Sequence, residues 1–271
     1  MSTPTINLVY WQPAKPIVRG LPFRRKVKNF GDVLSPVIVE DAALARGVNT
    51  ARPIADATLI AIGSMMHRAN DGDVIWGTGV NGAVDPGLHR FRQLDVRAVR
   101  GPLTASLLAE WGVQSSGVFG DPAILLPKFR PDLVELSTNK TSKVTYVPNL
   151  HDTKAWRKSG LRPLLDPTSP LEKCLRTIVT SELVIASSLH AVIIAQSFGA
   201  RIALVRSGRE SLFKYEDYFA GIGQELPRVW DSPDEVDIES IPVSVAPTKD
   251  TVDRLLGAFP ADLWERRVDL D

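Results

Sequence analysis

Short apolar runs alternate with helical patterns through the first half of the chain. The runs that we expect to form strands are residues 6–10, 58–62, 74–76, 96–99 and 117–119. Between the first two strands, Ser35 is the expected N-cap of a helix, with Pro36 at its first position and Gly47 just beyond its end. A second helix is expected to begin at Pro102 and to end before Gly112. This alternation predicts βαβ units and a mainly parallel sheet.

A polar stretch without periodicity, residues 127–143, separates this pattern from a second one. Since such stretches are typical of domain boundaries, we expect two α/β domains, one over residues 1–130 and one over residues 143–271. This division also allows the C-terminal helix to pack against the first domain.

The second half repeats the alternation of strands and helices. Its expected strands are residues 144–147, 183–186 and 202–205. Ser169 is the expected N-cap of a capping box that opens a helix reaching about Thr180. A helix over residues 190–198, closed by Gly199, and a last helix over residues 247–258 complete the prediction.

Composition and charge exclude several classes of protein. The 271 residues include 32 Lys and Arg against 31 Asp and Glu, so the net charge of +1 lacks the basic excess of a nucleic-acid-binding protein. A single cysteine, Cys174, excludes an internal disulfide framework and a cysteine-based zinc site. Residues 183–205 are too polar for a membrane span, and residues 1–10 do not resemble a signal peptide. We therefore expect a cytoplasmic protein with no integral membrane segment and at most a peripheral membrane contact.

Residues 77–82 read GTGVNG and match the glycine pattern of dinucleotide-binding loops. That fingerprint also needs a helix directly after the loop and an acidic residue at the end of the next strand. Residues 83–87 form a turn sequence instead, and Asp95 lies at the start of its strand. We therefore favour a flexible loop at the carboxyl edge of the sheet over an NAD site, and we expect Gly79 to contact a ligand at that edge.

Two junctions between a strand and a helix are suited to bind anions. At each junction, free backbone N–H groups and the positive end of the helix dipole attract phosphate or carboxylate. Arg100 stands at the first junction, where its guanidinium can add a bidentate contact. Ser187, Ser188 and His190 stand at the second. The alternative interpretations are an arginine paired with a surface carboxylate and a capped core histidine.

Other polar loops lie at the same edge of the predicted sheets. The further positions that we expect to contact a ligand are Asn29, Gly31, Asp32, Asp121, Asn149 and His151. Gly31 permits close backbone approach, and Asp32 can accept hydrogen bonds from sugar hydroxyls or take a proton. Asp121 precedes a proline and is equally suited to form a turn.

Four motifs together resemble the polysaccharide pyruvyl transferase family, most closely its bacterial exopolysaccharide, succinoglycan-type branch. They are Asn29-Phe30-Gly31-Asp32, Arg100-Gly101-Pro102-Leu103-Thr104, Gly120-Asp121-Pro122 and Ser188-Leu189-His190-Ala191. They follow the family's order and spacing over roughly residues 29–205. The resemblance implies a GT-B-like fold, in which two Rossmann-like domains face each other across a cleft that holds the site.

The resemblance also implies an activity. The donor would be phosphoenolpyruvate, without a metal ion or cofactor, and the acceptor a sugar of an exopolysaccharide or of its lipid-linked oligosaccharide precursor. The product would be a pyruvate ketal, with release of phosphate. Arg100 and His190 match catalytic-site residues of the family, whereas Ser188 stands where some members carry an arginine. The candidates to bind the donor carboxylate in its place are Arg97, Arg201 and Arg206.

The implied reaction gives these residues roles. His190, its pKa raised by the anionic donor, would protonate the methylene carbon as a general acid. Arg100 and the helix N-termini would hold the anionic groups, while Asp32 or Asp121 would orient or deprotonate the acceptor hydroxyls. We further expect the donor to bridge Arg100 and His190 as the halves close. The alternatives are a nucleotide-sugar glycosyltransferase of the same architecture and a non-catalytic sugar-binding protein.

Overall fold

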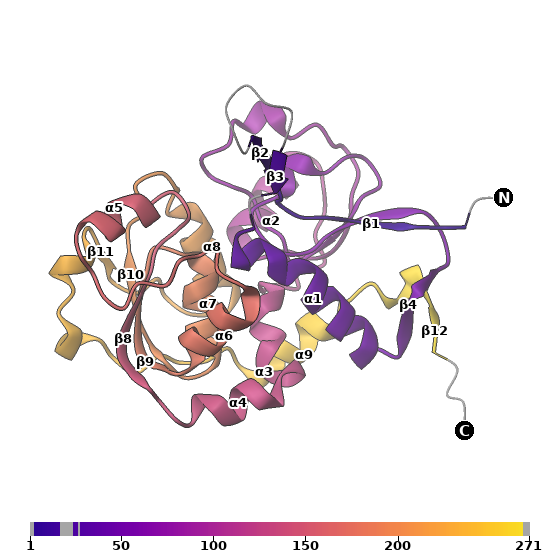
Figure 1. Ribbon diagram of the computed structural model, residues 1–271. Coiled ribbons are helices and arrows are strands. Elements are labelled where there is room, and N and C mark those ends of the chain that lie inside the picture. Colours follow the sequence, from indigo (N-terminus) through magenta and orange to yellow (C-terminus); the bar gives the residue numbers. More distant parts are fainter. Residues whose placement is uncertain (1–2, 17–23, 27, 268–271) are drawn as a thin grey trace.

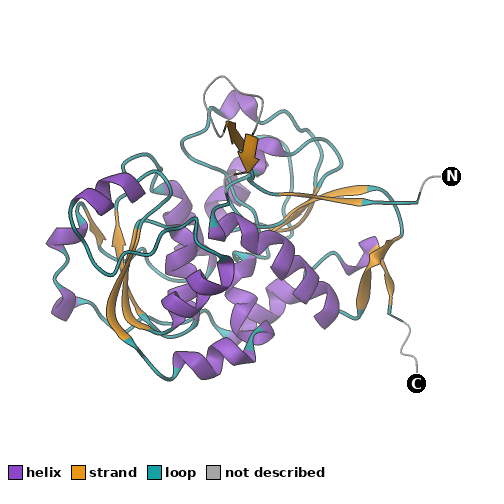
Figure 2. Cartoon of the chain, viewed as in Figure 1, coloured by secondary structure: helices purple, strands orange, loops and turns teal. Residues whose placement is uncertain are grey.

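The protein contains two parallel four-stranded sheets, one in each half of the chain (Figures 1 and 2). The computed structural model describes residues 3–16, 24–26 and 28–267. The strand order in the N-terminal sheet is β1 (Ile6–Val9), β5 (Ala57–Ile60), β6 (Val74–Trp76) and β7 (Asp95–Ala98). The order in the C-terminal sheet is β11 (Val229–Trp230), β10 (Arg201–Val205), β9 (Ser181–Ala186) and β8 (Ser142–Val147). The predicted α/β class with parallel sheets is confirmed.

Helices connect the strands and cover the sheets. Their bounds are α1 (Phe30–Ala45), α2 (Pro102–Glu110), α3 (Leu126–Phe129), α4 (Pro131–Ser137), α5 (Thr153–Lys158), α6 (Leu171–Val179), α7 (Leu189–Ser197), α8 (Phe213–Gly221) and α9 (Lys249–Gly257). A short 3-10 helix, η3 (Pro122–Leu125), precedes α3. Within the residues described, no helix has the length and apolar character needed to cross a membrane.

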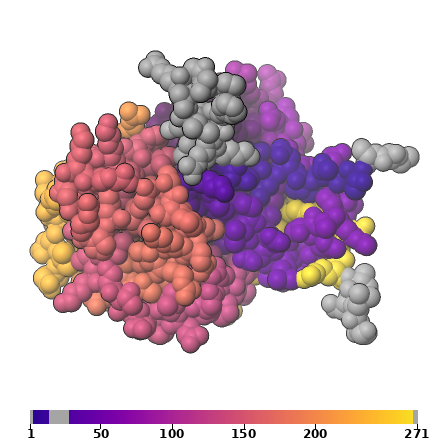
Figure 3. Space-filling model, in the orientation of Figure 1, coloured from indigo at the N-terminus to yellow at the C-terminus, as the bar shows by residue number. Residues whose placement is uncertain are grey.

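Helices from both halves pack against each other between the two sheets. α1 contacts α6, α2 contacts α8, and η3 contacts α7. Leu34 and Ile38 of α1 belong to the same buried apolar core as Val192 and Ile193 of α7. In the space-filling view, the surfaces of the two halves lie directly against each other (Figure 3). This shared core stabilises one relative position of the halves, so the geometry does not favour the predicted closing motion.

The C-terminal segment returns to the N-terminal half. In Figure 1, the yellow helix α9 lies beside α3, below α1. The indole Nε1 of Trp76 donates a hydrogen bond of 2.9 Å to the carbonyl oxygen of Leu255 in α9. Beyond α9, β12 (Trp264–Arg266) pairs antiparallel with β4 (Val48–Pro53). A second antiparallel pair joins β2 (Ala14–Pro16) to β3 (Arg24–Lys26).

Two predicted helix starts are wrong. α1 begins one and a half turns before Ser35, because Asn29 takes the extended N-cap conformation and Phe30 and Leu34 are then buried on one face. Pro36 therefore lies inside the helix, where its ring removes one backbone hydrogen bond. At α6, the carbonyl of Pro170 accepts the first helical bond, so Pro170 rather than Ser169 is the N-cap.

Two other predicted segments also differ. Residues 117–119 contribute only an isolated bridge, Val99 to Phe119, because Gly117 and Gly120 on either side adopt positive φ angles that interrupt an extended strand. The expected linker at residues 127–143 contains α3 and α4. Pro131 begins α4, and the fully buried Leu133 anchors that helix to the core.

Candidate active site

A cavity of about 320 Å³ lies where α1 and α7 begin. Its walls come from loops at the carboxyl ends of strands in both sheets, the position at which open α/β sheets bind ligands. The residues that line it are Trp11, Asn29, Asp32, Gly63, Ser64, Met65, His67, Arg68, Asn81, Val84, Asn149, Leu150, His151, Ser188, Leu189, His190, Glu210 and Lys214.

His190 lies in the first turn of α7, against the start of α1. Ser188 is the N-cap of α7, and its side chain makes no capping hydrogen bond, so its hydroxyl remains available at the cavity wall. The imidazole packs directly on the backbone of Gly31, where an added Cβ would lie 2.2 Å from Nδ1 of His190. Gly31 was predicted to let a ligand approach its backbone closely. In the structure, the side chain of His190 takes that position.

Two carboxylates flank His190. Nε2 of His190 lies 3.7 Å from Oδ2 of Asp121, and both atoms are buried without a hydrogen-bond partner in the described structure. The other oxygen of Asp121 accepts a bond from the N–H of Ala123 at the start of η3, so the predicted turn also forms. On the cavity side, Asp32 accepts a bond of 2.6 Å from the amide of Asn29.

Burial shifts the pKa values of His190, Asp121 and Asp32. It lowers the pKa of His190 to about 4, and the positive charges of Lys214 and Arg100 act in the same direction while Asp32 opposes them. Burial raises the pKa of Asp121 to about 6 and also raises that of Asp32. His190 is therefore neutral at pH 7 in the protein without a donor. The predicted raised pKa of His190 is not a property of the protein alone, because it depends on the charge of a bound donor.

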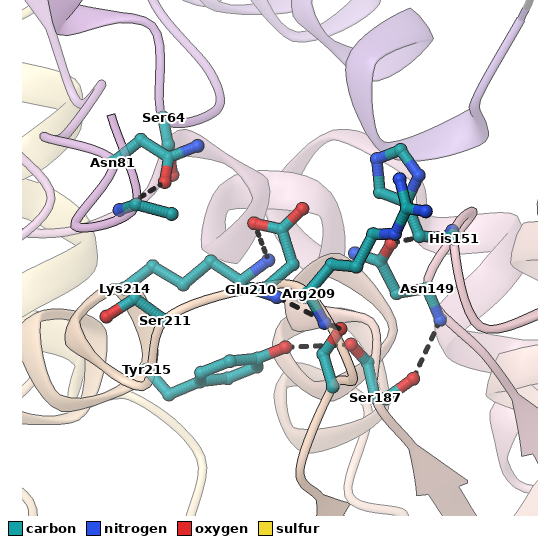
Figure 4. Close-up of polar contacts among 12 residues, drawn as sticks. Ser64, Asn81, Asn149, His151, Ser187, Arg209, Glu210, Ser211, Lys214 and Tyr215 are labelled. Atoms are coloured by element: carbon teal, nitrogen blue, oxygen red, sulfur yellow. Dashed lines mark hydrogen bonds and ion pairs between the residues drawn. The ribbon is translucent and has the colours of Figure 1, made fainter. Parts of the chain in front are cut away.

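A hydrogen-bond network holds three loops of the C-terminal half around the cavity (Figure 4). The hydroxyl of Ser187 donates to Asp152 at 2.7 Å and accepts from the backbone N–H of Asn149 at 2.9 Å. The hydroxyl of Tyr215 donates to the carbonyl oxygen of Ser187. Asp152 also accepts from the N–H of Gly208. Ser187 is therefore a buried positioning residue, not the ligand contact that we expected from the sequence.

The anion-binding junction at Arg100 is occupied by the protein's own carboxylate. Nε of Arg100 contacts Asp217 of α8 at 3.0 Å, and both side chains are fully buried. Asp217 also accepts bonds from the N–H and hydroxyl of Thr104 in the first turn of α2. The remaining guanidinium nitrogens donate to Ser64 and to the carbonyl of Val80. The structure therefore contradicts the prediction that Arg100 faces the cleft, and the donor bridge from Arg100 to His190 stays a prediction.

Two glycines of the loop formed by residues 77–82 pack against other parts of the protein. The N–H of Gly79 donates to the carbonyl of Gly63, and a Cβ at Gly79 would lie 2.4 Å from the guanidinium carbon of Arg100. Gly77 packs in the same way against Pro122. Turns and a 3-10 helix follow the loop. The glycines thus permit close packing around Arg100, and the prediction that Gly79 contacts a ligand is wrong. Asn81 of the same loop does reach the cavity.

The predicted site residues therefore fall into two sets. Those that line the cavity are Asn29, Asp32, Asn149, His151, Ser188 and His190. Those that lie behind its walls are Gly31, Gly79, Arg100, Asp121 and Ser187. The three arginines proposed for the donor carboxylate are engaged elsewhere: Arg97 pairs with Asp95 and Asp262, Arg201 donates to backbone carbonyls, and Arg206 pairs with Asp231.

The sequence of the chain was compared with known protein families, curated proteins and solved structures. A model of the polysaccharide pyruvyl transferase domain matches residues 64–205, just over half of the chain. The chain belongs to the polysaccharide pyruvyl transferase family. It is similar to the succinoglycan biosynthesis protein ExoV of Rhizobium meliloti (strain 1021), with 28% identity over 212 residues. That alignment covers 72% of this chain and 62% of ExoV, so the chain spans less than two thirds of its relative's length. No solved structure matches the chain.

The pyruvyl transferase domain match includes Arg100, Asp121 and His190 but neither α1 nor α8. Both helices nevertheless complete the cavity. α8 supplies Lys214, and the loop before it supplies Glu210, two residues that sequence reasoning missed. The sequence does contain a signal for Glu210 and Lys214. They follow the buried strand 202–205, so they lie at the same carboxyl edge of the sheet as the other predicted site loops.

Removing one partner of the buried Arg100–Asp217 pair is expected to destabilise the fold strongly. Replacing Asp217 with alanine leaves a buried guanidinium without its counter-charge, which should lower the free energy of unfolding by about 3–5 kcal/mol. The matched control is Asp262→Ala, which breaks the surface pair with Arg97 and should cost about 0–1 kcal/mol. Urea unfolding of both variants measures the difference. Equal losses would contradict the structural role assigned to Asp217.

Proposed function

We propose that this protein transfers the pyruvyl moiety of phosphoenolpyruvate to a sugar of an exopolysaccharide or of its lipid-linked precursor, in the cavity at the start of α1 and α7. The observation that carries the proposal is the position of His190 on the cavity wall, between Asp32 and the buried Asp121. Family membership and the similarity to a succinoglycan biosynthesis protein support the same reaction class.

The size and electrostatics of the cavity suit a small anionic donor. A volume of about 320 Å³ is at the lower end of the range for ligand sites, which favours phosphoenolpyruvate over a nucleotide sugar. The first-turn N–H groups of α7 and the hydroxyl of Ser188 are available to one anionic group of the donor. We propose that these groups bind the donor without a metal ion or cofactor.

The reaction balances with His190 as the proton donor. A bound anion raises the pKa of His190, whose imidazolium then protonates C3 of the donor, while Asp121 stabilises the positive charge. One acceptor hydroxyl adds to the cationic C2, and the second hydroxyl displaces phosphate from the same carbon. Of the two hydroxyl protons, one replaces the proton given by His190 and the other leaves with phosphate.

The remaining cavity residues suit the acceptor. Asp32 is placed to orient or deprotonate a sugar hydroxyl, and Asn81 and Asn149 offer amide groups for others. Trp11 offers an apolar surface to the face of a sugar ring. On the scale of the whole molecule, we propose a GT-B-like pair of Rossmann-like domains over residues 1–130 and 143–271, acting in the cytoplasm or at the inner face of the membrane.

A direct assay tests the proposed reaction. Purified protein incubated with phosphoenolpyruvate and a succinoglycan-type oligosaccharide should release phosphate and form a pyruvate ketal in equal amounts. Activity should persist after treatment with a chelator. Parallel thermal-shift measurements should show stabilisation by phosphoenolpyruvate but not by UDP or GDP. Stabilisation by a nucleotide alone, with sugar transfer in place of ketal formation, would assign the protein to the glycosyltransferases instead.

A further inference from the structure

Lys214 is a buried cation in the cavity wall. It lies in the first turn of α8, and its side chain is 9% exposed. Its ammonium contacts Glu210 at 3.1 Å (Figure 4). Burial lowers the pKa of Lys214, although the carboxylate of Glu210 acts to raise it. An ammonium removed from water in this way is stabilised by any further anion that approaches it.

The ammonium retains hydrogen-bonding capacity toward the cavity. It has three N–H donors, and within the described part of the chain Glu210 is the one side chain that accepts from it. Glu210 and Lys214 both line the cavity, together with Ser64 and Asn81 from the N-terminal half. The ion pair therefore borders the ligand space.

Lys214 also acts electrostatically on the catalytic group. Its positive charge lowers the pKa of His190 and that of Asp32, and all three side chains line the same cavity. Arg68 is the other Lys or Arg residue in the cavity wall, and it is exposed. Lys214 is thus the cation that an anion in the interior of the cavity meets.

We propose that Lys214 binds an oxyanion of the donor, either its carboxylate or its phosphate, and that Glu210 holds the ammonium in position before the donor arrives. This inference rests on the proposed function. Lys214 replaces Arg97, Arg201 and Arg206 as the candidate cation for the donor, since those arginines are engaged outside the cavity.

The test compares Lys214→Gln with Glu210→Gln. If the ion pair were only structural, breaking it from either side would have the same effect on donor binding. Lys214→Gln removes the charge but keeps an N–H donor for Glu210, and it should weaken binding of phosphoenolpyruvate by about 10- to 100-fold. Glu210→Gln keeps an acceptor oxygen for the ammonium but holds it less firmly, and should weaken binding by less than Lys214→Gln does. Lys214→Arg should retain part of the affinity. The control is Lys128→Gln, which breaks a surface pair with Asp253 and should not change binding.

Calorimetric titrations with phosphoenolpyruvate, inorganic phosphate and pyruvate decide the outcome. A loss confined to phosphate or to pyruvate in Lys214→Gln identifies the group that Lys214 holds, and either result supports the proposal. If the wild-type protein binds phosphoenolpyruvate and Lys214→Gln binds it equally well, the assignment of Lys214 is wrong while the proposed function stands. If the wild-type protein binds none of the three anions, the proposed function itself fails.

Discussion

Replacing His190 with glutamine lowers the rate of phosphate release from phosphoenolpyruvate by about 10²–10⁴-fold, because general acid catalysis supplies an acceleration of that order. Glutamine retains a hydrogen-bond donor for the carboxylate of Asp121 but does not supply a proton at neutral pH. The fold should therefore persist. Phosphate release is measured at saturating donor and acceptor, and thermal unfolding of the same preparation confirms that the variant is folded.

A second property separates a catalytic His190 from a structural one. Because the pKa of His190 is about 4 without donor and rises beside a bound anion, donor binding at pH 7 should take up protons. The affinity should then fall as the pH rises through the pKa of His190 in the complex. Calorimetry in two buffers of different ionisation enthalpy measures the uptake, which His190→Gln should abolish. The control is His89→Gln, a histidine outside the cavity wall. Full turnover in His190→Gln would remove His190 from the mechanism.

Replacing Asp121 with asparagine should lower kcat by about 10²–10⁴-fold while changing donor affinity little, since Asp121 lies behind His190 and does not line the cavity. The carboxylate stabilises the imidazolium, so its removal lowers the pKa of His190 in the donor complex. Activity that depends on the protonated histidine is lost as the pH rises through that pKa. The loss should therefore occur at lower pH in the variant than in the wild type.

The pH profile of kcat distinguishes this positioning role from a loss of stability. Asp132→Asn is the matched control, because Asp132 pairs with Arg130 on the surface, away from the cavity. It should leave both kcat and its pH profile unchanged. A lower kcat in Asp121→Asn with an unshifted profile would indicate that Asp121 supports the fold around His190 without acting on its proton.

Local sequence was sufficient where one segment determines its own structure. The buried runs 74–76 and 202–205 form strands as predicted, within one residue of the expected bounds, because continuous apolar residues between turn signals are typical of buried parallel strands. The loop from Ser188 to His190 reaches the site for the same reason, since it follows a buried strand and begins a helix.

Prediction failed where the partner is remote in the sequence. Asp217 is 117 residues from Arg100, and no local pattern indicates that its carboxylate occupies the anion-binding junction at α2. The same limit applies to Gly79, whose neighbour is the guanidinium of Arg100. At α1, the burial of Phe30 against the rest of the core outweighed the local preference for Pro36 at the first helical position. Tertiary packing decided each of these cases.

The most direct test of the central claim is the reaction run in D2O with phosphoenolpyruvate and an oligosaccharide acceptor. Protonation of the donor methylene by His190 predicts a ketal whose methyl group carries one deuterium, formed together with one phosphate, and detectable by NMR and mass spectrometry. His190→Gln should form little of this product. A wild-type protein that yields no deuterium-labelled ketal, or that transfers a sugar from a nucleotide donor in its place, would contradict the account.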